Sequence, residues 1–375
     1  MTYRTALLDW LACAAAGRDE PATRAARAAG MSTLERVAAA GTAGHVLDFD
    51  DTYEPGLAHL SAAVAPSAIV MAAARRASVR VALDAFAAGF EAMAAVARAS
   101  HPALYERGLH PTAVCGPVGA AVAASRVLGL RDAAERSATA LALLRGAGLQ
   151  AAFGSDGKAL QVGLSAAAGV AAANLAAGGA SVPLERAADG FARAFGGRFA
   201  EPDGQPAVDE NWIKAYPCCL QTHSAIEAAA GVRATNGSAP EAPVVAVHPL
   251  SRSAAPYDVP EDGLQAKFSL PYTTACALLH GAPRVEDFRS PDADAAALAA
   301  RIEVRTDERL RQSEAVLYDG DTEIARVEAA LGSPARPMSE EQLAAKVSAL
   351  VGDRLDGALD DLRQPAGRLI SAIGL

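Results

Sequence analysis

Residues 47–54 read LDFDDTYE and bring four acidic side chains together in an alanine-rich sequence. The spacing Asp48-x-Asp50-x-Thr52 matches the nucleophile loop of haloacid-dehalogenase-type phosphatases. An Asp-Asp-x-x-Glu spacing that starts at Asp50 matches the aspartate-rich magnesium motif of terpene and prenyl synthases. A third interpretation is a carboxylate site in another kind of helical enzyme. The flanking sequence has to decide among the three.

The phosphatase interpretation requires the first aspartate to end a buried β-strand. The preceding residues 38–47 read AAAGTAGHVL, with Gly, Thr and His where that strand should be, and no alternation of strands and helices follows. The synthase interpretation needs a second magnesium motif and an aromatic pocket. No convincing second motif is present, and only 5% of the residues are aromatic. The flanks therefore favour the third interpretation.

Lysine is the other residue type that points to chemistry. Only four of the 34 basic residues are lysine, and the others are arginine. Lys158, Lys214 and Lys267 lie close to Gly, Pro or Tyr in unusual local sequences. A primary amine retained against this bias indicates a specific role, such as binding a carboxylate as a compact point charge.

The elements that must position these residues are mainly helices. Up to about residue 205, apolar residues recur at i, i+3 and i+4 in segments that end at glycines. A polar, proline-containing stretch follows, and then strands alternate with helices. Ser339 begins a final helix. The sequence predicts a mainly α fold, in which a large all-helical domain (1–208 and 338–375) is interrupted by a smaller α+β lid domain (209–337).

Composition excludes several kinds of partner. The net charge is −9 and no basic run is present, so nucleic acid and anionic membrane surfaces are not expected partners. The longest apolar tract consists of Ala and Gly with Ser and Asn, which is too weakly hydrophobic for a convincing membrane span. The five cysteines show no disulfide framework or zinc spacing, and the N-terminus reads as an amphipathic helix. We expect a cytoplasmic protein.

Five segments of the chain, taken together and in order, form a specific pattern. They are GHVLDFDDTYEPGLAHLS (44–61), GLHPTAVCGPVGAAVAASRVLGL (108–130), GKALQVGLSAAAGVAAANLA (157–176), KAYPCCLQTHSAIEAA (214–229) and AKFSLPYTTACALLHG (266–281). In these segments the chain resembles the MmgE/PrpD family, which includes 2-methylcitrate dehydratase, cis-aconitate decarboxylase and iminodisuccinate epimerase. The resemblance implies a helical domain with an α+β lid, a homodimer, and chemistry without metal or organic cofactor.

Carried over position by position, the resemblance implies a set of residues in the active-site cleft. The set divides into catalytic residues, which include two histidines, and residues that bind substrate. The implied catalytic residues are Asp48, His59, His110, Lys158 and Tyr272, and the implied substrate-binding residues are Thr52, Lys214 and Lys267.

The chemistry that this family shares passes through electron-rich species next to a carboxylate and needs a base, an acid and cations. His59 or His110 would serve as base and acid, in an order that the sequence leaves open. Lysines would hold substrate carboxylates, and Tyr272 would donate a proton or hydrogen bond. Asp48 would orient His59 or Lys158, because a buried carboxylate needs a partner.

Other polar residues of these segments receive structural interpretations. Asp50 and Asp51 are interpreted as residues that cap or begin a helix. His45 is interpreted as a hydrogen-bonded structural histidine, and Cys218 and Cys219 as packed thiols.

The sequence thus predicts a lyase that acts on a small di- or tricarboxylate, with dehydration of a 2-methylcitrate-like hydroxy acid as the first expectation. Epimerisation or decarboxylation of an iminodisuccinate-like or cis-aconitate-like acid is the alternative within the same fold. A dimer that binds a carboxylate without turnover is a second class, and a magnesium-dependent prenyl synthase is a third.

Overall fold

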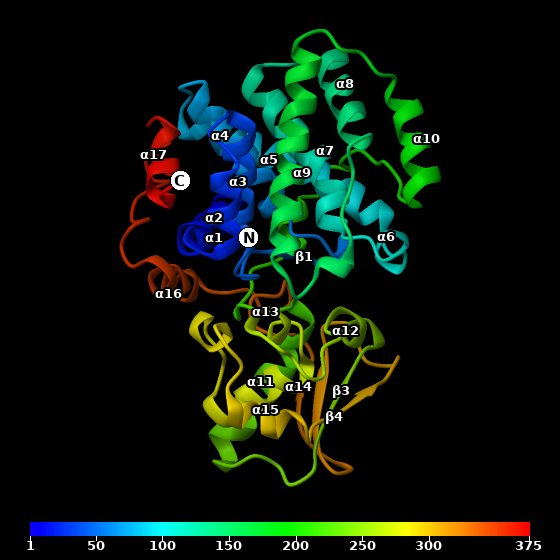
Figure 1. Ribbon diagram of the computed structural model, residues 1–375, viewed down its shortest axis with the longest axis vertical. Coiled ribbons are helices and arrows are strands. Elements are labelled where there is room, and N and C mark those ends of the chain that lie inside the picture. Colours follow the sequence, from blue (N-terminus) through cyan, green and yellow to red (C-terminus); the bar gives the residue numbers. More distant parts are fainter. The chain divides into compact units, whose positions relative to one another are not determined.

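The computed structural model describes residues 1–375 except for the side chain of Asn236, and the chain forms two compact units (Figure 1). Unit 1 consists of Met1–Ala152, Asp156–Ile213 and Met338–Leu375. Unit 2 consists of Phe153–Ser155 and Lys214–Pro337. The expected mainly α fold is confirmed, because strands form only small sheets among the described residues.

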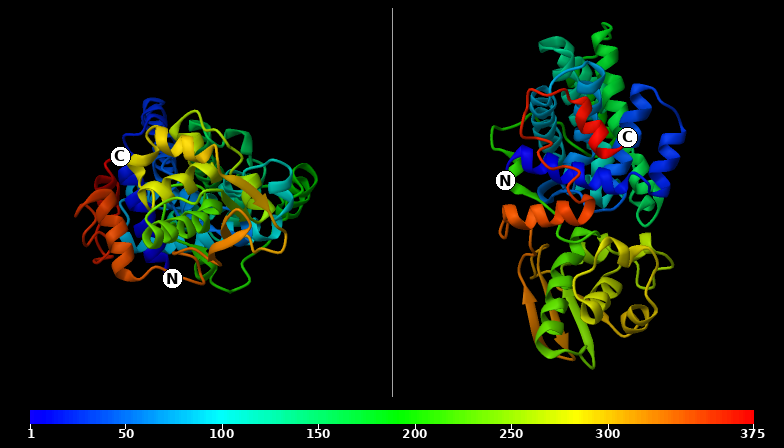
Figure 2. Two further views of the ribbon diagram at one scale, coloured as in Figure 1. Left: turned by 90° about the horizontal axis from the view of Figure 1, so that it is seen from below. Right: turned by 90° about the vertical axis from the view of Figure 1, so that its left-hand side faces the viewer.

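Unit 1 is helical and contains both ends of the chain. The C-terminal segment returns to it, and α16 packs against the first helix, α1 (Figure 2). Its longer helices are α1 (Tyr3–Gly17), α2 (Pro21–Ala28), α3 (Thr33–His45), α4 (Leu60–Ala74), α5 (Val79–Ser100), α7 (Pro111–Leu128), α8 (Asp132–Leu143), α9 (Asp156–Ala177), α10 (Leu184–Phe195), α16 (Glu340–Val351) and α17 (Gly367–Ile373), and a short α6 spans Ala103–Glu106.

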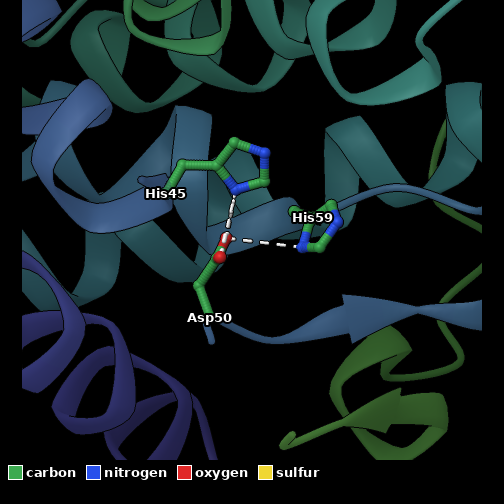
Figure 3. A group of neighbouring side chains, drawn as sticks. All are labelled: His45, Asp50 and His59. Carbon is green, nitrogen blue, oxygen red and sulfur yellow. Dashed lines mark hydrogen bonds and ion pairs between the residues drawn. The ribbon is translucent and has the colours of Figure 1, made fainter. Parts of the chain in front are cut away.

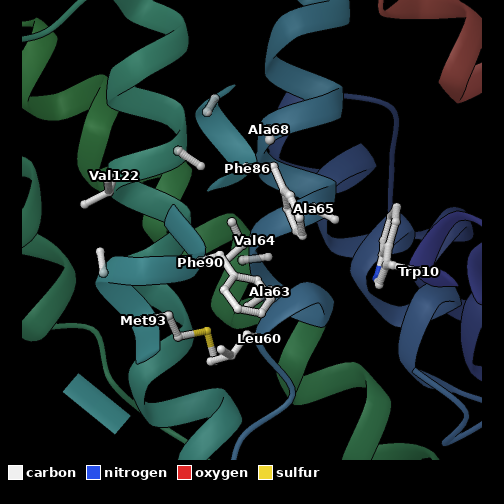
Figure 4. Packing of buried hydrophobic residues seen from close by; sticks show 14 of the residues in the cluster. Trp10, Leu60, Ala63, Val64, Ala65, Ala68, Phe86, Phe90, Met93 and Val122 are labelled. Carbon is white, nitrogen blue, oxygen red and sulfur yellow. The ribbon is translucent and has the colours of Figure 1, made fainter. Parts of the chain in front are cut away.

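Small side chains let these helices approach closely around a few large ones. Leu60 and Val64 of α4 pack with Phe90 and Met93 of α5 in the buried core (Figure 4). Alanine is the most frequent residue at the remaining core positions. Interhelical distance depends on the side chains at the contact, so an alanine-rich core brings the helix backbones close together.

One of these close approaches joins α3 and α9, the two helices that carry His45 and Lys158. A Cβ on Gly41 of α3 would lie 2.9 Å from the Cα of Gly163 on α9. A Cβ on Gly163 would overlap the carbonyl oxygen of Ala38 and the hydroxyl of Thr42. Glycine at these two positions therefore sets the distance between α3 and α9.

Replacing Gly163 with Ala is expected to destabilise unit 1 by about 1–3 kcal/mol, because the added methyl forces two backbones apart. Gly190→Ala on α10 is the matched control, since nothing lies within 4 Å of a Cβ there. That change is expected to stabilise the protein by up to about 1 kcal/mol through helix propensity. Denaturant titrations compare the two, and equal effects would contradict the close-approach argument.

Helices α7 and α9 are long and apolar enough to cross a membrane by length and composition alone. In the structure, 83% of the most apolar window of α7 and 56% of that of α9 are buried within the chain. The two helices also pack against each other in unit 1. Their apolar side chains therefore form part of the core of unit 1.

Unit 2 is built on a four-stranded sheet with the strand order β4-β3-β5-β6. Strand β3 pairs parallel to β4 and antiparallel to β5, and β5 and β6 form a hairpin with its turn after Asp319. The strands are β3 (Pro243–Val247), β4 (Glu303–Thr306), β5 (Ala315–Asp319) and β6 (Thr322–Val327), and the helices are α11 (His223–Asn236), α12 (Pro249–Ala254), α13 (Gly263–Ala266), α14 (Leu270–His280) and α15 (Ala293–Ala299).

One expectation about unit 1 is wrong in detail. The sequence shows no strand before residue 205, yet β1 (Thr52–Tyr53) pairs antiparallel with β2 (Asn211–Trp212). These strands are too short to produce a recognisable alternation. They bring the acidic stretch next to Asn211, which matters for the cluster described below.

Candidate functional site

The acidic stretch forms the connection between α3 and α4, with a histidine at each end. His45 is the last residue of α3, and His59 is the N-cap residue of α4. The chain turns sharply at Asp48, whose φ of 53° is in the left-handed region that Asp tolerates better than most residues. This turn directs the two histidines and their intervening carboxylates into one buried cluster.

Asp50 lies between the two imidazoles (Figure 3). Its Oδ2 is 2.9 Å from Nδ1 of His45 and 3.4 Å from Nδ1 of His59. Burial alone would raise the pKa of Asp50, but the two neighbouring histidines hold that pKa well below the usual range. Asp50 is therefore a carboxylate, and the interpretation that it caps a helix is wrong.

His45 connects this carboxylate to Lys158. Its Nδ1 donates to Asp50, so its Nε2 carries the lone pair and accepts from Nζ of Lys158 at 2.8 Å. Burial lowers the pKa of His45, and the positive charge of Lys158 also lowers it, against the opposite effect of Asp50. His45 is thus a neutral link inside the cluster, which the sequence treated only as a structural residue.

Lys158 of α9 is 6% exposed and has a second partner. Its Nζ lies 2.9 Å from Oδ1 of Asp48, whereas the same oxygen lies 3.9 Å from Nε2 of His59. Of the two partners expected for Asp48, the lysine is therefore the one in hydrogen-bond contact. The pair places one positive charge among the imidazoles.

His59 is held through its Nδ1 nitrogen. The other ring nitrogen, Nε2, is the one that would accept a proton. Its Nδ1 is 2.8 Å from the backbone carbonyl oxygen of Asp51 and 3.4 Å from Oγ1 of Thr52. A carbonyl oxygen only accepts hydrogen bonds, so Nδ1 carries the hydrogen and Nε2 carries the lone pair of the neutral ring. The backbone N–H of His59 donates to Oγ1 of Thr112 at 3.0 Å.

Asp51 lies next to the cluster, and three hydrogen bonds hold its carboxylate in place. Its carboxylate accepts from the backbone N–H and hydroxyl of Ser61 at 3.2 and 2.6 Å, and from Nδ2 of Asn211 at 2.7 Å. Burial raises its pKa to about 7, partly offset by the hydroxyl of Ser61. The interpretation that it caps a helix is partly correct, because Ser61 lies in the first turn of α4.

His110 is the third imidazole of the buried cluster. It is the N-cap residue of α7 and is 2% exposed. The centre of its ring lies 6.1 Å from that of His45, which in turn lies 4.5 Å from that of His59. Nδ1 of His110 is 2.8 Å from Nε2 of Gln161, a residue that the sequence did not single out.

Protonation of His110 predicts a pH dependence of stability. Burial lowers the pKa of His110 well below its ordinary value, and Lys158 lowers it further. The unfolded state takes up this proton near pH 6.5 and the folded state does not, so stability is lost as the pH falls below about 6.5. Between about pH 6 and 5, wild-type unfolding free energy should fall about 1.4 kcal/mol per pH unit more steeply than that of His110→Gln. Parallel curves from denaturant titrations would contradict this burial effect.

The remaining predicted residues lie in unit 2 and are also buried. Nζ of Lys214 donates to the carbonyl of Cys218 at 3.0 Å, and Nζ of Lys267 lies 5.6 Å from the centre of the Phe288 ring. The hydroxyl of Tyr272 accepts from the backbone N–H of Asp292 at 2.8 Å, and burial raises its pKa. Their roles toward a substrate stay predictions.

Metal binding has one candidate group among the described residues. One ligand atom each of His45, Asp50 and His59 lie within 4.8 Å of one another. In a zinc site each donor lies about 2.0–2.2 Å from the ion, and a ligating ring nitrogen carries no hydrogen. Here Nδ1 of His59 faces a carbonyl oxygen, which requires that hydrogen. Nδ1 of His59 is therefore a hydrogen-bond donor and not a metal ligand.

Unit 1 is helical and buries imidazoles, carboxylates and a lysine together, and unit 2 of the same chain is an α+β unit. These features define a mainly α protein with a cluster that is suited to proton transfer. The N-terminal domain model of the MmgE/PrpD family matches residues 30–201, and the C-terminal domain model matches residues 216–364. The chain belongs to the MmgE/PrpD family.

Two relatives show the same relationship. The chain is 28% identical over 344 residues to cis-aconitate decarboxylase of Homo sapiens, a match that covers 82% of this chain and 70% of the relative. It is 30% identical over 277 residues to cis-aconitate decarboxylase of Mus musculus, covering 67% of this chain and 55% of the relative.

Proposed function

We propose that this protein is a cofactor-free lyase that moves a proton at a carbon next to a carboxylate of a small di- or tricarboxylate. One observation carries the proposal: His45, His59, His110 and Lys158, from four separate segments, gather with ionised Asp50 in one buried cluster. Burying so many ionisable groups is costly unless they are paired, and such groups concentrate at functional sites.

The cluster supplies what such a reaction needs. A neutral imidazole with an available lone pair can carry a proton near neutral pH. A lysine and a neutral imidazole N–H can stabilise the negative charge that develops on carboxylate oxygens. As the family resemblance implies, we propose that Lys214 and Lys267 bind substrate carboxylates, and that Tyr272 donates a proton or hydrogen bond.

Two reactions fit this arrangement. The names of the two relatives favour decarboxylation of a cis-aconitate-like acid: the C–C bond to one carboxylate breaks, its electron pair remains on carbon, carbon dioxide leaves, and an imidazolium protonates the resulting anion. The second is dehydration of a 2-methylcitrate-like acid, in which an imidazole removes a C–H proton, an acid such as Tyr272 protonates the hydroxyl oxygen, the C–O bond breaks and water leaves. Both end in an unsaturated acid and share the proton carrier.

The test is proton exchange followed by NMR. Purified protein is incubated in deuterated water, with and without excess chelator, with citrate-like, aconitate-like and aspartate-derived acids, and denatured protein serves as the control. Deuterium incorporated next to a carboxylate supports the proposal, and release of carbon dioxide or water identifies the reaction. Binding without exchange or turnover across the panel would overturn it in favour of a carboxylate-binding protein, and activity abolished by chelator would favour a magnesium enzyme.

The quaternary structure and location belong to the same proposal. The family resemblance supports a homodimer, and the absence of a disulfide framework supports a reducing compartment such as the cytoplasm. Light scattering of the purified protein measures the first, and a monomer at micromolar concentration would contradict it.

A further inference from the structure

Gln161 is held in one orientation by the backbone of Leu149. It lies on α9 one turn after Lys158. Its Oε1 accepts from the backbone N–H of Leu149 at 3.0 Å, and its Nε2 donates to the carbonyl oxygen of the same residue at 3.1 Å. A backbone N–H only donates and a carbonyl oxygen only accepts, so the side-chain amide cannot be reversed without losing both hydrogen bonds.

The fixed amide determines which nitrogen of His110 carries the hydrogen. The amide nitrogen of Gln161 has a second N–H and no lone pair to offer, and it lies 2.8 Å from Nδ1 of His110. Nδ1 must therefore accept, and the neutral ring carries its hydrogen on Nε2. His59 is the reverse, because its Nδ1 donates to the carbonyl of Asp51.

We propose that Gln161 is a positioning residue that keeps His110 neutral in the Nε2–H form, so that His110 donates a hydrogen bond to the substrate and His59 carries the proton. This assignment rests on the proposed function. A neutral imidazole that donates a hydrogen bond can polarise a substrate oxygen without transferring its proton. The lone pair at Nε2 of His59 is the complementary acceptor.

Backbone hydrogen bonds hold the segment before His110 against residues 148–150, the loop that contacts Gln161. The backbone N–H of His110 donates to the carbonyl of Gly148 at 3.1 Å, and that of Gln150 donates to the carbonyl of Gly108 at 2.9 Å. Gly148 has a φ of 145°, and a Cβ there would lie 2.5 Å from Cβ of Ala113 and 3.2 Å from Oε1 of Gln161. A glycine at this position makes room for the amide between the loop and α7.

The hydrogen positions are measured directly by nitrogen-15 NMR of protein labelled at histidine, without substrate. The chain has seven histidines, and His110→Gln identifies the His110 signals by their loss. In the wild type we expect Nδ1 of His110 to resonate as an unprotonated acceptor and Nε2 as a protonated nitrogen. Protonated Nδ1 in the wild type would overturn the proposal.

Gln161→Glu is the decisive variant, because a carboxylate only accepts hydrogen bonds and requires a hydrogen on Nδ1 of His110. Gln150→Glu is its matched control: the Nε2 of Gln150 donates to the carbonyls of Tyr105 and Leu109, and these hydrogen bonds involve no histidine ring. We expect the His110 signals to show protonation at Nδ1 in Gln161→Glu alone.

The same pair of variants is compared on whichever acid is turned over. Loss of one hydrogen-bond donor to a developing charge predicts a kcat about 100-fold lower for Gln161→Glu, with KM changed less than about threefold. Gln150→Glu should stay within about threefold of the wild type. Equal losses in both variants, or an unchanged kcat in Gln161→Glu, would overturn the role of Gln161. Because the NMR measurement needs no substrate, it can fail or succeed independently of the proposed function.

Discussion

Replacing His59 with Asn is expected to lower kcat by about 10²–10⁴-fold, the usual contribution of a positioned acid–base group. The amide nitrogen of Asn can still donate to the carbonyl of Asp51, as Nδ1 of His59 does at 2.8 Å. The variant removes the basic Nε2 and little else. KM should therefore change far less than kcat, because the lost interaction belongs to the transition state.

His248→Asn is the matched control for this experiment. His248 is the N-cap residue of α12 in unit 2, where its Nδ1 accepts from the backbone N–H of Leu250 at 3.1 Å. Asn is among the preferred N-cap residues, so this helix end should remain capped. Turnover within about twofold of the wild type is expected in the control. Wild-type turnover in His59→Asn would exclude His59 as the proton carrier.

Replacing Lys346 with Met should destabilise unit 1 by about 3–5 kcal/mol, because it leaves a buried charge without its counterion. Nζ of Lys346 lies 2.6 Å from Oδ1 of Asp9, and the two side chains are 5% and 0% exposed. The same amine donates to the carbonyl oxygen of Phe49 at 2.8 Å and lies 4.0 Å from the centre of its ring. Denaturant titration measures the loss.

Two comparisons separate the charge effect from packing. The double variant Asp9→Leu/Lys346→Met should recover most of the lost stability, because an apolar pair of similar volume often replaces a buried ion pair without penalty. Arg136→Met, which breaks half-exposed contacts with Glu185 and Glu201, should cost less than about 1 kcal/mol. A Lys346→Met variant as stable as Arg136→Met would contradict the prediction.

Much of the fold could be predicted because it depends on local patterns. Helical periodicity and the hairpin around Asp319 are properties of contiguous sequence. The expected lid covered 209–337, whereas unit 2 runs from Lys214 to Pro337 and includes Phe153–Ser155. The segment Phe153–Ser155 has only three residues and is far in sequence from the rest of unit 2. No periodicity in the sequence could have assigned it to that unit.

For the same reason, some residues of the candidate site could be predicted from the sequence and others could not. Lys158 was noticeable because lysine is rare in this chain, and the resemblance then implied His59 and His110. His45 was overlooked because its importance comes from Lys158, which is 113 positions away. Gln161 is an ordinary residue of an apolar helix, and only the backbone of Leu149 gives it a fixed orientation. A half-buried glutamine one turn after Lys158 was the one available signal.

The contact between Lys346 and Phe49 also constrains the order of events during synthesis. The partners are 297 positions apart, and all of unit 2 is translated between them. At about 5–20 residues per second, the N-terminal helices leave the ribosome about 15–60 s before α16 is complete. Throughout that interval Asp9 lacks its lysine, so α1 and the acidic stretch reach their final packing only after unit 2 has emerged.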